Sequence, residues 1–271
     1  MIKKLSIFFF FTILHYQLSA QSEIDSLGEN IQKIAYAIQE NDTLSIRIQQ
    51  DSFLYLKLYE TLATPHSFSF SFDSLQSIKL IKSPDGLFKF FTWQLALNNE
   101  HYIQKGILQI KKSDGQTLLF KLNDISDEIE NPTDFIGSNQ KWIGAVYYDI
   151  IQNEFQGKIY YTLLGFDAYD KHITHKLIEV VHFEKDQLVF GGDFFNYPSD
   201  ETYPEAPVKR FIYSYKNGAN AFIRYEKDAK AIVLSELASI TNDLNEKSTL
   251  VPTGDEVYFI WKNGKWVMPK K

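Results

Sequence analysis

Apolar residues recur at steps of three and four along the first part of the chain. The stretch 23–39 carries one such stripe, made of Ile24, Leu27, Ile31, Ile34 and Ile38. This period is typical of an amphipathic helix. A second stripe runs from Leu44 to about Ala63, after a polar break in which Thr43 can cap the helix, and Pro65 follows it. We therefore expect two helices within residues 23–63 that cover a sheet; the alternative is a helix pair that binds a partner.

The period changes to two after Pro65. Phe68, Phe70 and Phe72 alternate with serines, which predicts a half-buried strand. Asx-Gly dipeptides, which are typical of β-hairpin turns, then separate further apolar runs at 85–86, 114–115, 217–218 and 263–264. The predicted strands are 87–97, 102–111, 117–122, 142–151, 158–166, 176–183, 188–195, 207–215, 221–225, 231–234, 256–261 and 265–267. No long helix separates these runs, so we expect an antiparallel sheet.

Two of the predicted strands, 142–151 and 159–166, carry apolar side chains on both faces. Such strands lie in the middle of a sandwich, a barrel or a sheet covered by helices. The predicted fold is therefore α+β and mainly β, with antiparallel strands over residues 67–268 in a sandwich- or barrel-like sheet and two N-terminal helices packed on it. We expect one globular domain over residues 21–271, with a weak internal boundary at the acidic, turn-rich stretch 124–140.

The first twenty residues have the pattern of a secretory signal peptide. Lys3 and Lys4 precede a mostly apolar run from Leu5 to Tyr16, and small residues stand before a cut between Ala20 and Gln21. A twelve-residue helix rises about 18 Å, which is shorter than the roughly 30 Å of a membrane core. We therefore expect cleavage rather than a retained anchor, no integral membrane segment afterwards, and a secreted or periplasmic protein.

Composition excludes several functional classes. The chain has no cysteine, so it forms no disulfide, no cysteine-ligated metal site and no lipoprotein anchor. Its 28 basic and 34 acidic residues give a net charge of −6, which becomes −8 once two lysines leave with the signal peptide. Such a balance does not favour a nucleic-acid partner. No nucleotide, phosphate or zinc-protease motif is present, so we expect no cofactor.

The best candidate for metal chemistry is the cluster of Asp167, Asp170 and His172, with His175 and His182 following. A zinc or iron site needs three or four convergent ligands, and only Asp170 and His172 lie close enough in the sequence to converge locally. The alternative is a polar turn with surface histidines. A denser acidic run at 124–134 can hold calcium weakly or form a solvated loop; we expect the loop, because no twelve-residue calcium pattern is present.

Several blocks together resemble an uncharacterised family of secreted proteins from Bacteroidetes-type bacteria. They are SPDG with FKFFTW at 83–93, YYTLLGFD at 160–167, RFIYSY at 210–215 and IRY at 223–225. A glycine often follows the aspartate of the second block in that family, where this chain has Ala168. The resemblance implies export to the bacterial envelope. It implies no activity and no site residues.

These observations lead us to expect a non-catalytic binding or scaffolding module of the bacterial envelope, with an envelope protein or a glycan as partner. One alternative is a periplasmic hydrolase whose site forms only in the fold, from residues such as Asp167, Asp170 and His172. Another is a carbohydrate-binding module that presents exposed aromatic rings, since Tyr and Trp stack on sugars. Adjacent predicted strands carry Tyr147, Tyr148, Tyr160 and Tyr161, which we expect to be mainly core packing.

Overall fold

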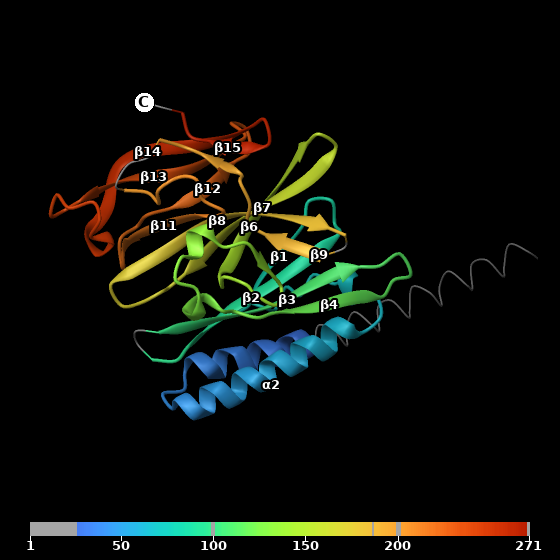
Figure 1. Ribbon diagram of the computed structural model, residues 1–271. Coiled ribbons are helices and arrows are strands. Elements are labelled where there is room, and N and C mark those ends of the chain that lie inside the picture. Colours follow the sequence, from blue (N-terminus) through green and yellow to red (C-terminus); the bar gives the residue numbers. More distant parts are fainter. Residues whose placement is uncertain (1–25, 99–100, 186, 199–201, 270–271) are drawn as a thin grey trace, which may run out of the picture. The chain divides into compact units, whose positions relative to one another are not determined.

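The computed structural model describes residues 26–98, 101–185, 187–198 and 202–269. The predicted signal peptide and the first residues of the predicted first helix lie outside these ranges. The fold is α+β and mainly β, with two N-terminal helices and open sheets that do not close on themselves (Figure 1). The chain divides into two compact units. The first comprises residues up to 78 together with 109–119, and the second comprises 79–108 and 120–271.

The first unit contains both helices where the apolar period predicts them. The described part of the first helix covers residues 26–39, and α2 spans Leu44–Ala63. Thr43 takes the predicted N-cap position in an extended conformation, although its hydroxyl makes no capping bond. At the other end the Thr64 hydroxyl donates to the Thr61 carbonyl at 2.7 Å, and Thr64 is extended, as the following proline requires.

The strand predicted at 67–72 is wrong. Ser67–Ser69 form a 3-10 helix, η1, and no strand begins before β1 in the described part of the chain. The cause is local, because the Ser67 hydroxyl donates to the Leu62 carbonyl at 2.6 Å and holds this segment against the end of α2. Serine competes with sheet formation in this way. The apolar half of the prediction holds, since Phe68, Phe70 and Phe72 are all buried.

The strands form three sheets, paired almost entirely antiparallel. One sheet contains β1 (Lys79–Lys82), β2 (Phe88–Ala96), β3 (Tyr102–Lys111) and β4 (Thr117–Leu122), in that order. Another contains β5 (Gly137–Ser138), β9 (Gln187–Phe190), β8 (Ile173–Glu184), β7 (Lys158–Asp167) and β6 (Val146–Phe155), with β11 (Phe211–Lys216) also on β8. The last contains β10 (Phe195–Asn196), β15 (Lys265–Val267), β14 (Leu250–Lys262), β13 (Ala231–Ser239) and β12 (Ile223–Glu226). Strand β10 pairs in parallel with β15.

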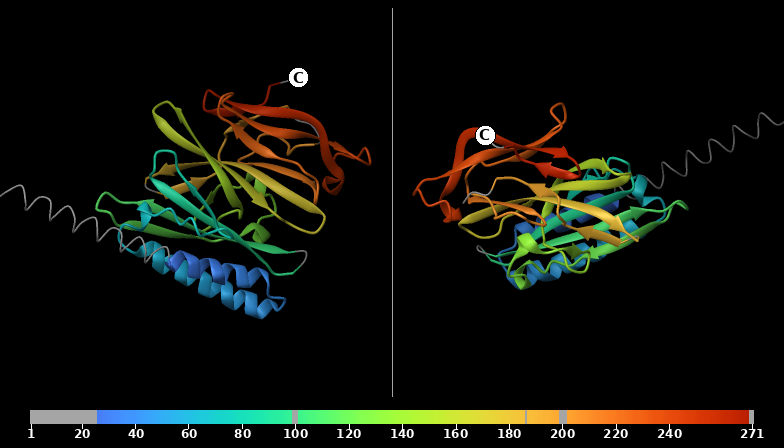
Figure 2. Two further views of the ribbon diagram at one scale, coloured as in Figure 1. Left: turned by 180° about the vertical axis from the view of Figure 1, so that it is seen from behind. Right: turned by 45° about the horizontal axis from the view of Figure 1, so that its top comes forward.

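Strand β8 is shared by two partners along one edge. Its first half pairs with β11, from Ile173 opposite Lys216 to Ile178 opposite Phe211. Its second half pairs with β9, and β7 lies along the other edge. The predicted strand 188–195 is split into β9 and β10, and Gly191 and Gly192, which lie between them, both have positive φ. Figure 2 shows the strands from two further sides. The first half of β8 therefore lies between β7 and β11.

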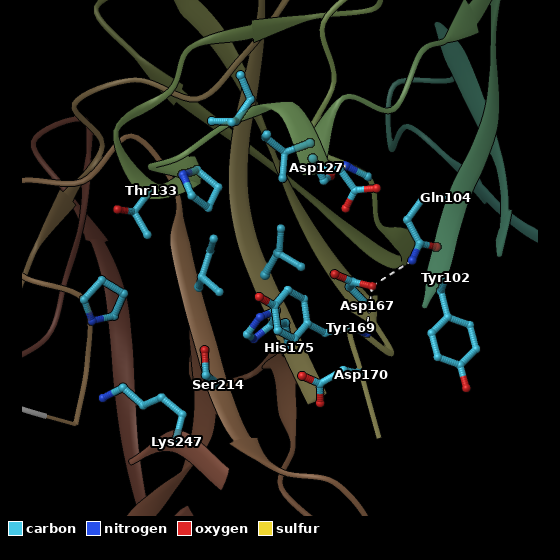
Figure 3. Close-up of a pocket in the computed structure, with 18 of the residues that line it drawn as sticks. Tyr102, Gln104, Asp127, Thr133, Asp167, Tyr169, Asp170, His175, Ser214 and Lys247 are labelled. Carbon is cyan, nitrogen blue, oxygen red and sulfur yellow. Dashed lines mark hydrogen bonds between the residues drawn. The ribbon is translucent and has the colours of Figure 1, made fainter. Parts of the chain in front are cut away.

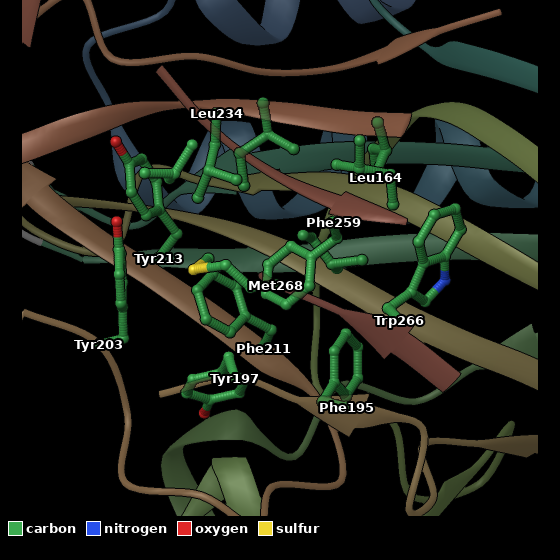
Figure 4. Close-up of a cluster of buried hydrophobic side chains, with 14 of the residues drawn as sticks. Leu164, Phe195, Tyr197, Tyr203, Phe211, Tyr213, Leu234, Phe259, Trp266 and Met268 are labelled. Carbon is green, nitrogen blue, oxygen red and sulfur yellow. The ribbon is translucent and has the colours of Figure 1, made fainter. Parts of the chain in front are cut away.

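Side chains from the sheets of β8 and β14 form one large aromatic core in the second unit (Figure 4). The Phe211 and Phe259 rings lie 5.1 Å apart, edge to face. The indole of Trp266 is fully buried and donates to the Thr162 hydroxyl at 2.8 Å. Of the predicted tyrosine pairs, Tyr147 and Tyr161 are buried, while Tyr148 and Tyr160 are half-buried against the core.

A chain of buried polar groups crosses the same unit. Arg210 Nε donates to Glu179 Oε1 at 2.7 Å, and neither side chain has any exposed surface. The Tyr147 hydroxyl donates to Glu179 Oε2 at 2.7 Å and accepts from the Trp142 indole at 2.8 Å. Trp142 lies outside β6, because this strand starts four residues later than predicted, at Val146, and ends at Phe155.

Candidate functional site

A cavity of about 630 Å³ opens in the second unit (Figure 3). It lies where the start of β3, the end of β7, the first half of β8 and the middle of β11 meet the loop 124–133. The predicted weak boundary at 124–140 thus includes part of the wall of this cavity. Loops at strand ends commonly carry binding groups, because the sheet holds them in place.

Two aspartates line the cavity, Asp167 at the end of β7 and Asp170 in the turn that follows, and each is held through one carboxylate oxygen. Asp167 Oδ1 accepts from the Tyr169 amide at 3.0 Å and from Gln104 Nε2 at 2.7 Å. Asp170 Oδ1 accepts from the amides of His172 and Ile173 at 2.6 and 2.7 Å, which is an Asx turn. Neither Oδ2 atom accepts a hydrogen bond from the described residues, so each carboxylate keeps one oxygen for a ligand.

Asp124 has a structural role at the rim. Its Oδ1 accepts from the backbone amide and the hydroxyl of Ser126 and from the backbone amide of Gly144. Its Oδ2 accepts from the backbone amide of Gln104 at 2.8 Å. The expectation that the run 124–134 is a solvated loop is therefore wrong for Asp124, which is half-buried and bonded to three segments. This residue fixes Gln104, which in turn orients Asp167.

An aromatic wall stands beside the carboxylates. The Tyr169 ring lies over the His175 ring, with centroids 4.1 Å apart, and Tyr169 remains 50% exposed. Beneath it His175 Nδ1 is buried without a hydrogen-bond partner in the described structure. Tyr102 and Tyr203 line other parts of the cavity.

Burial shifts the titration of two groups in opposite directions. Burial raises the pKa of Asp167 to about 6, assisted by the charges of Asp124 and Asp127 and opposed by the bonds from Tyr169 and Gln104. Burial lowers the pKa of His175 to about 4, and the Asp170 carboxylate only partly offsets it. At neutral pH Asp167 is therefore mainly ionised and the His175 imidazole is uncharged.

Acidic side chains outnumber basic ones around the cavity. Asp124, Asp127, Glu130, Asp167 and Asp170 line it together with one lysine, Lys247. The Lys247 ammonium already donates to the Thr202 and Leu244 carbonyls, at 3.1 and 2.9 Å. His101 Nε2 lies 3.0 Å from Asp127 Oδ2 near the rim. The remaining field in the cavity is negative.

The structure brings together two of the three residues singled out in the sequence. Asp167 and Asp170 line the cavity, while His172 is exposed and contributes only its backbone amide. His175 takes a place in the wall instead. Within the described ranges, no three His, Asp or Glu side chains lie close enough to hold a metal ion.

Nothing in the comparisons gives the chain a family. No protein-family model, curated protein or solved structure matches it. Among the described residues, no helix is long and apolar enough to cross a membrane. Any function must therefore be argued from the cavity itself.

Asp167 and His175 should change the stability of the fold with pH in opposite senses. Between pH 4 and 6 the folded state keeps a proton on Asp167 that the unfolded chain, with a pKa of 3.8, has released. Stability contributed by this group falls as the pH rises. Between pH 4 and 6.5 the unfolded chain binds a proton on His175 that the folded state lacks, so this contribution rises with pH.

We expect single variants to separate these two contributions. The unfolding free energy of Asp167→Asn minus that of wild type should increase by about 2 kcal/mol from pH 4 to pH 6. The same difference for His175→Gln should decrease by a similar amount from pH 4 to pH 6.5. Urea unfolding followed by tryptophan fluorescence at several pH values measures both differences. Two difference curves of the same sign would contradict the assigned pKa shifts.

Proposed function

We propose that this protein is an exported, non-catalytic binding module that takes one small polar ligand in the cavity of its second unit. The observation that carries the proposal is the pair of Oδ2 atoms, on Asp167 and Asp170, left without internal partners in a preformed cavity. The volume lies in the range of small-molecule sites. Backbone amides and Gln104 fix both carboxylates, so the site is organised before a ligand arrives.

Binding is favoured over catalysis by the state of the other polar groups. Asp124 is committed to four hydrogen bonds and is not available as a second acid or base. His175, with a pKa of about 4, is a weak base at neutral pH, whereas efficient general bases have a pKa near the working pH. The imidazole of His172 is not part of the wall.

A hydrolase is the second candidate, because Asp167 has the raised pKa of a general acid and Asp170 lies in the same wall. Carboxylate pairs with separated pKa values perform acid and base steps in glycosidases. The two candidates differ in the fate of the ligand. Mass spectrometry of a bound ligand after prolonged incubation should recover it unchanged, and a cleaved product would replace the binding proposal with the hydrolase.

Binding is tested with a panel of sugars, amino acids, amines and polyols, followed by thermal shift and calorimetry. At least one class should bind at one site per chain. Tyr169→Ala should weaken that binding about tenfold by removing half of the aromatic wall. Tyr258→Ala, which removes a comparably exposed tyrosine from β14, should leave it unchanged. Failure of every class to bind would refute the proposal.

A flat aromatic platform for carbohydrate has little support from the exposed rings. Trp93, Trp142 and Trp266 are buried. The exposed tyrosines are scattered: Tyr258 lies in β14, Tyr169 in the turn after β7, and Tyr36 and Tyr59 on the two N-terminal helices. A sugar remains a candidate ligand for the cavity, where Tyr102 and Tyr169 are available for stacking.

Export is the remaining part of the proposal and predicts a processed N-terminus. The protein expressed with its own first twenty residues in a Gram-negative host should be recovered from the periplasm or medium, beginning at or near Gln21. Deletion of residues 1–20 should keep it in the cytoplasm, because the Lys-Lys and apolar segments are the export signal. An exported protein that still begins at Met1 would show a retained anchor instead.

A further inference from the structure

The cavity of the proposed binding module has an excess of acceptors that suits one class of ligand. Both aspartates direct Oδ1 to internal donors and keep Oδ2 free, as described above. Gln104 also lines the cavity, but its Nε2 donates to Asp167 Oδ1 and its Oε1 is itself buried, so the two Oδ2 atoms are the acceptors that a ligand can reach. A ligand that supplies several N–H donors and a positive charge would satisfy such a set.

Among the described residues, no lysine or arginine side chain forms an ion pair with either aspartate. The Lys247 ammonium is held by backbone carbonyls, and the imidazole of His175 in the cavity wall is uncharged at neutral pH. Opposite charge within a half-buried site attracts more strongly than in water. An anionic ligand would meet repulsion at the same place.

The aromatic wall supplies the second contact that an organic cation needs. Ammonium and guanidinium groups bind over tyrosine faces, and Tyr169 keeps half of its surface exposed while His175 supports the ring from beneath. Figure 3 shows the Tyr169 ring over His175, with the side chains of Asp167 and Asp170 beside it. A bare metal ion fits less well, since no three carboxylates or imidazoles of the described residues converge.

We infer that the ligand carries a primary ammonium or guanidinium group, which Asp167 and Asp170 bind against the ring of Tyr169. The inference rests on the proposed binding function and narrows it to cationic small molecules or to the basic side chain of a short peptide. Both sources present the same chemistry to the aspartates.

Matched ligand pairs test the charge directly by calorimetry at pH 7.5. In the first arm, glucosamine is compared with glucose and N-acetylglucosamine. In the second, the peptide Gly-Lys-Gly is compared with Gly-norleucine-Gly, which lacks the ammonium. In at least one arm the cation should bind more than tenfold more tightly than its neutral partner; the arm that does so identifies the source.

Variants of the two aspartates then test whether their carboxylates bind the cation. Asp170→Asn keeps an Oδ1 acceptor for the turn and removes the carboxylate charge, so cation affinity should fall about tenfold, and Asp167→Asn should act similarly. Affinity for a neutral ligand should change less than twofold. The exposed Asp228→Asn, in the β12–β13 turn, is the control for a general loss of negative charge and should have little effect. A melting curve of each variant verifies that it is folded.

The outcomes separate this inference from the proposed function. Equal binding of cation and neutral partner in both arms would overturn the inference and leave the binding module standing. Tighter cation binding that survives Asp167→Asn and Asp170→Asn would overturn it as well, by placing the charge elsewhere. If none of these ligands binds in the cavity, both the proposed binding function and the inference of a cationic ligand are contradicted.

Discussion

Arg210→Met should lower the free energy of unfolding by about 3–5 kcal/mol, the cost of leaving a buried charge without its partner. Glu179 has no exposed surface, and Arg210 Nε is its only cationic contact, at 2.7 Å, among the described residues. The Tyr147 hydroxyl would remain as a donor to Glu179, but one neutral hydrogen bond does not replace a charge. Urea unfolding followed by tryptophan fluorescence measures the loss.

Two further variants decide whether the charge causes the effect. Arg210→Met combined with Glu179→Gln should recover part of the loss, because the second change removes the uncompensated charge. Lys209→Met removes the neighbouring ion pair with Asp193, in which the aspartate is exposed, and should leave the unfolding transition nearly unchanged. An Arg210→Met protein as stable as Lys209→Met would show that the buried pair contributes little.

The same arginine connects the core to the cavity. Its Nη1 donates to the Pro132 carbonyl, and the adjacent Lys209 amide donates to the Thr133 carbonyl at 2.7 Å. Pro132 and Thr133 line the cavity. Loss of Arg210 should therefore loosen this part of the wall as well as the core, and ligand affinity should fall together with stability.

The sequence pattern predicted those helices and turns whose conformation depends on residues close to each other in the sequence. The bounds of α2 follow from its apolar stripe and from the proline beyond it. The hairpin at Asn263-Gly264 forms because both residues take positive φ there, as a tight antiparallel turn requires. The alternation at 67–72 predicted the burial of the three phenylalanines correctly but not the backbone or the burial of Ser67, because the bond from Ser67 to Leu62 depends on the preceding helix.

The site could be predicted only in part, because its contacts join distant segments. Asp167 and Asp170 were visible as acids flanking a strand. Gln104 reaches Asp167 across 63 residues of sequence, and no periodicity encodes such a contact. His172 was expected to converge with Asp170, but the structure places His172 in the turn before β8 with an exposed side chain, and His175 lines the cavity instead.

Gly144→Ala should lower the free energy of unfolding by about 3 kcal/mol, at the upper end for an added methyl group in a packed interior. A Cβ atom at this position would lie 2.4 Å from Asp124 Oδ2 and 2.4 Å from Gln104 Cβ. Asp124 cannot move away without breaking its bonds to Ser126 and to the Gly144 amide itself. The strain therefore falls on the two residues that position Asp167.

Comparison with a second glycine separates this steric effect from the backbone cost of alanine. Gly157 has a φ of +74° and nothing within 4 Å of an added Cβ, so Gly157→Ala should cost about 1–2 kcal/mol through its left-handed backbone alone. It should also leave ligand affinity unchanged, because the β6–β7 turn is not part of the cavity wall. Gly144→Ala should lower ligand affinity as well as stability, since Asp167 loses the orientation that Gln104 provides. Equal losses of stability in the two variants, with affinity intact in both, would show that Gly144 is not needed for the arrangement of the site.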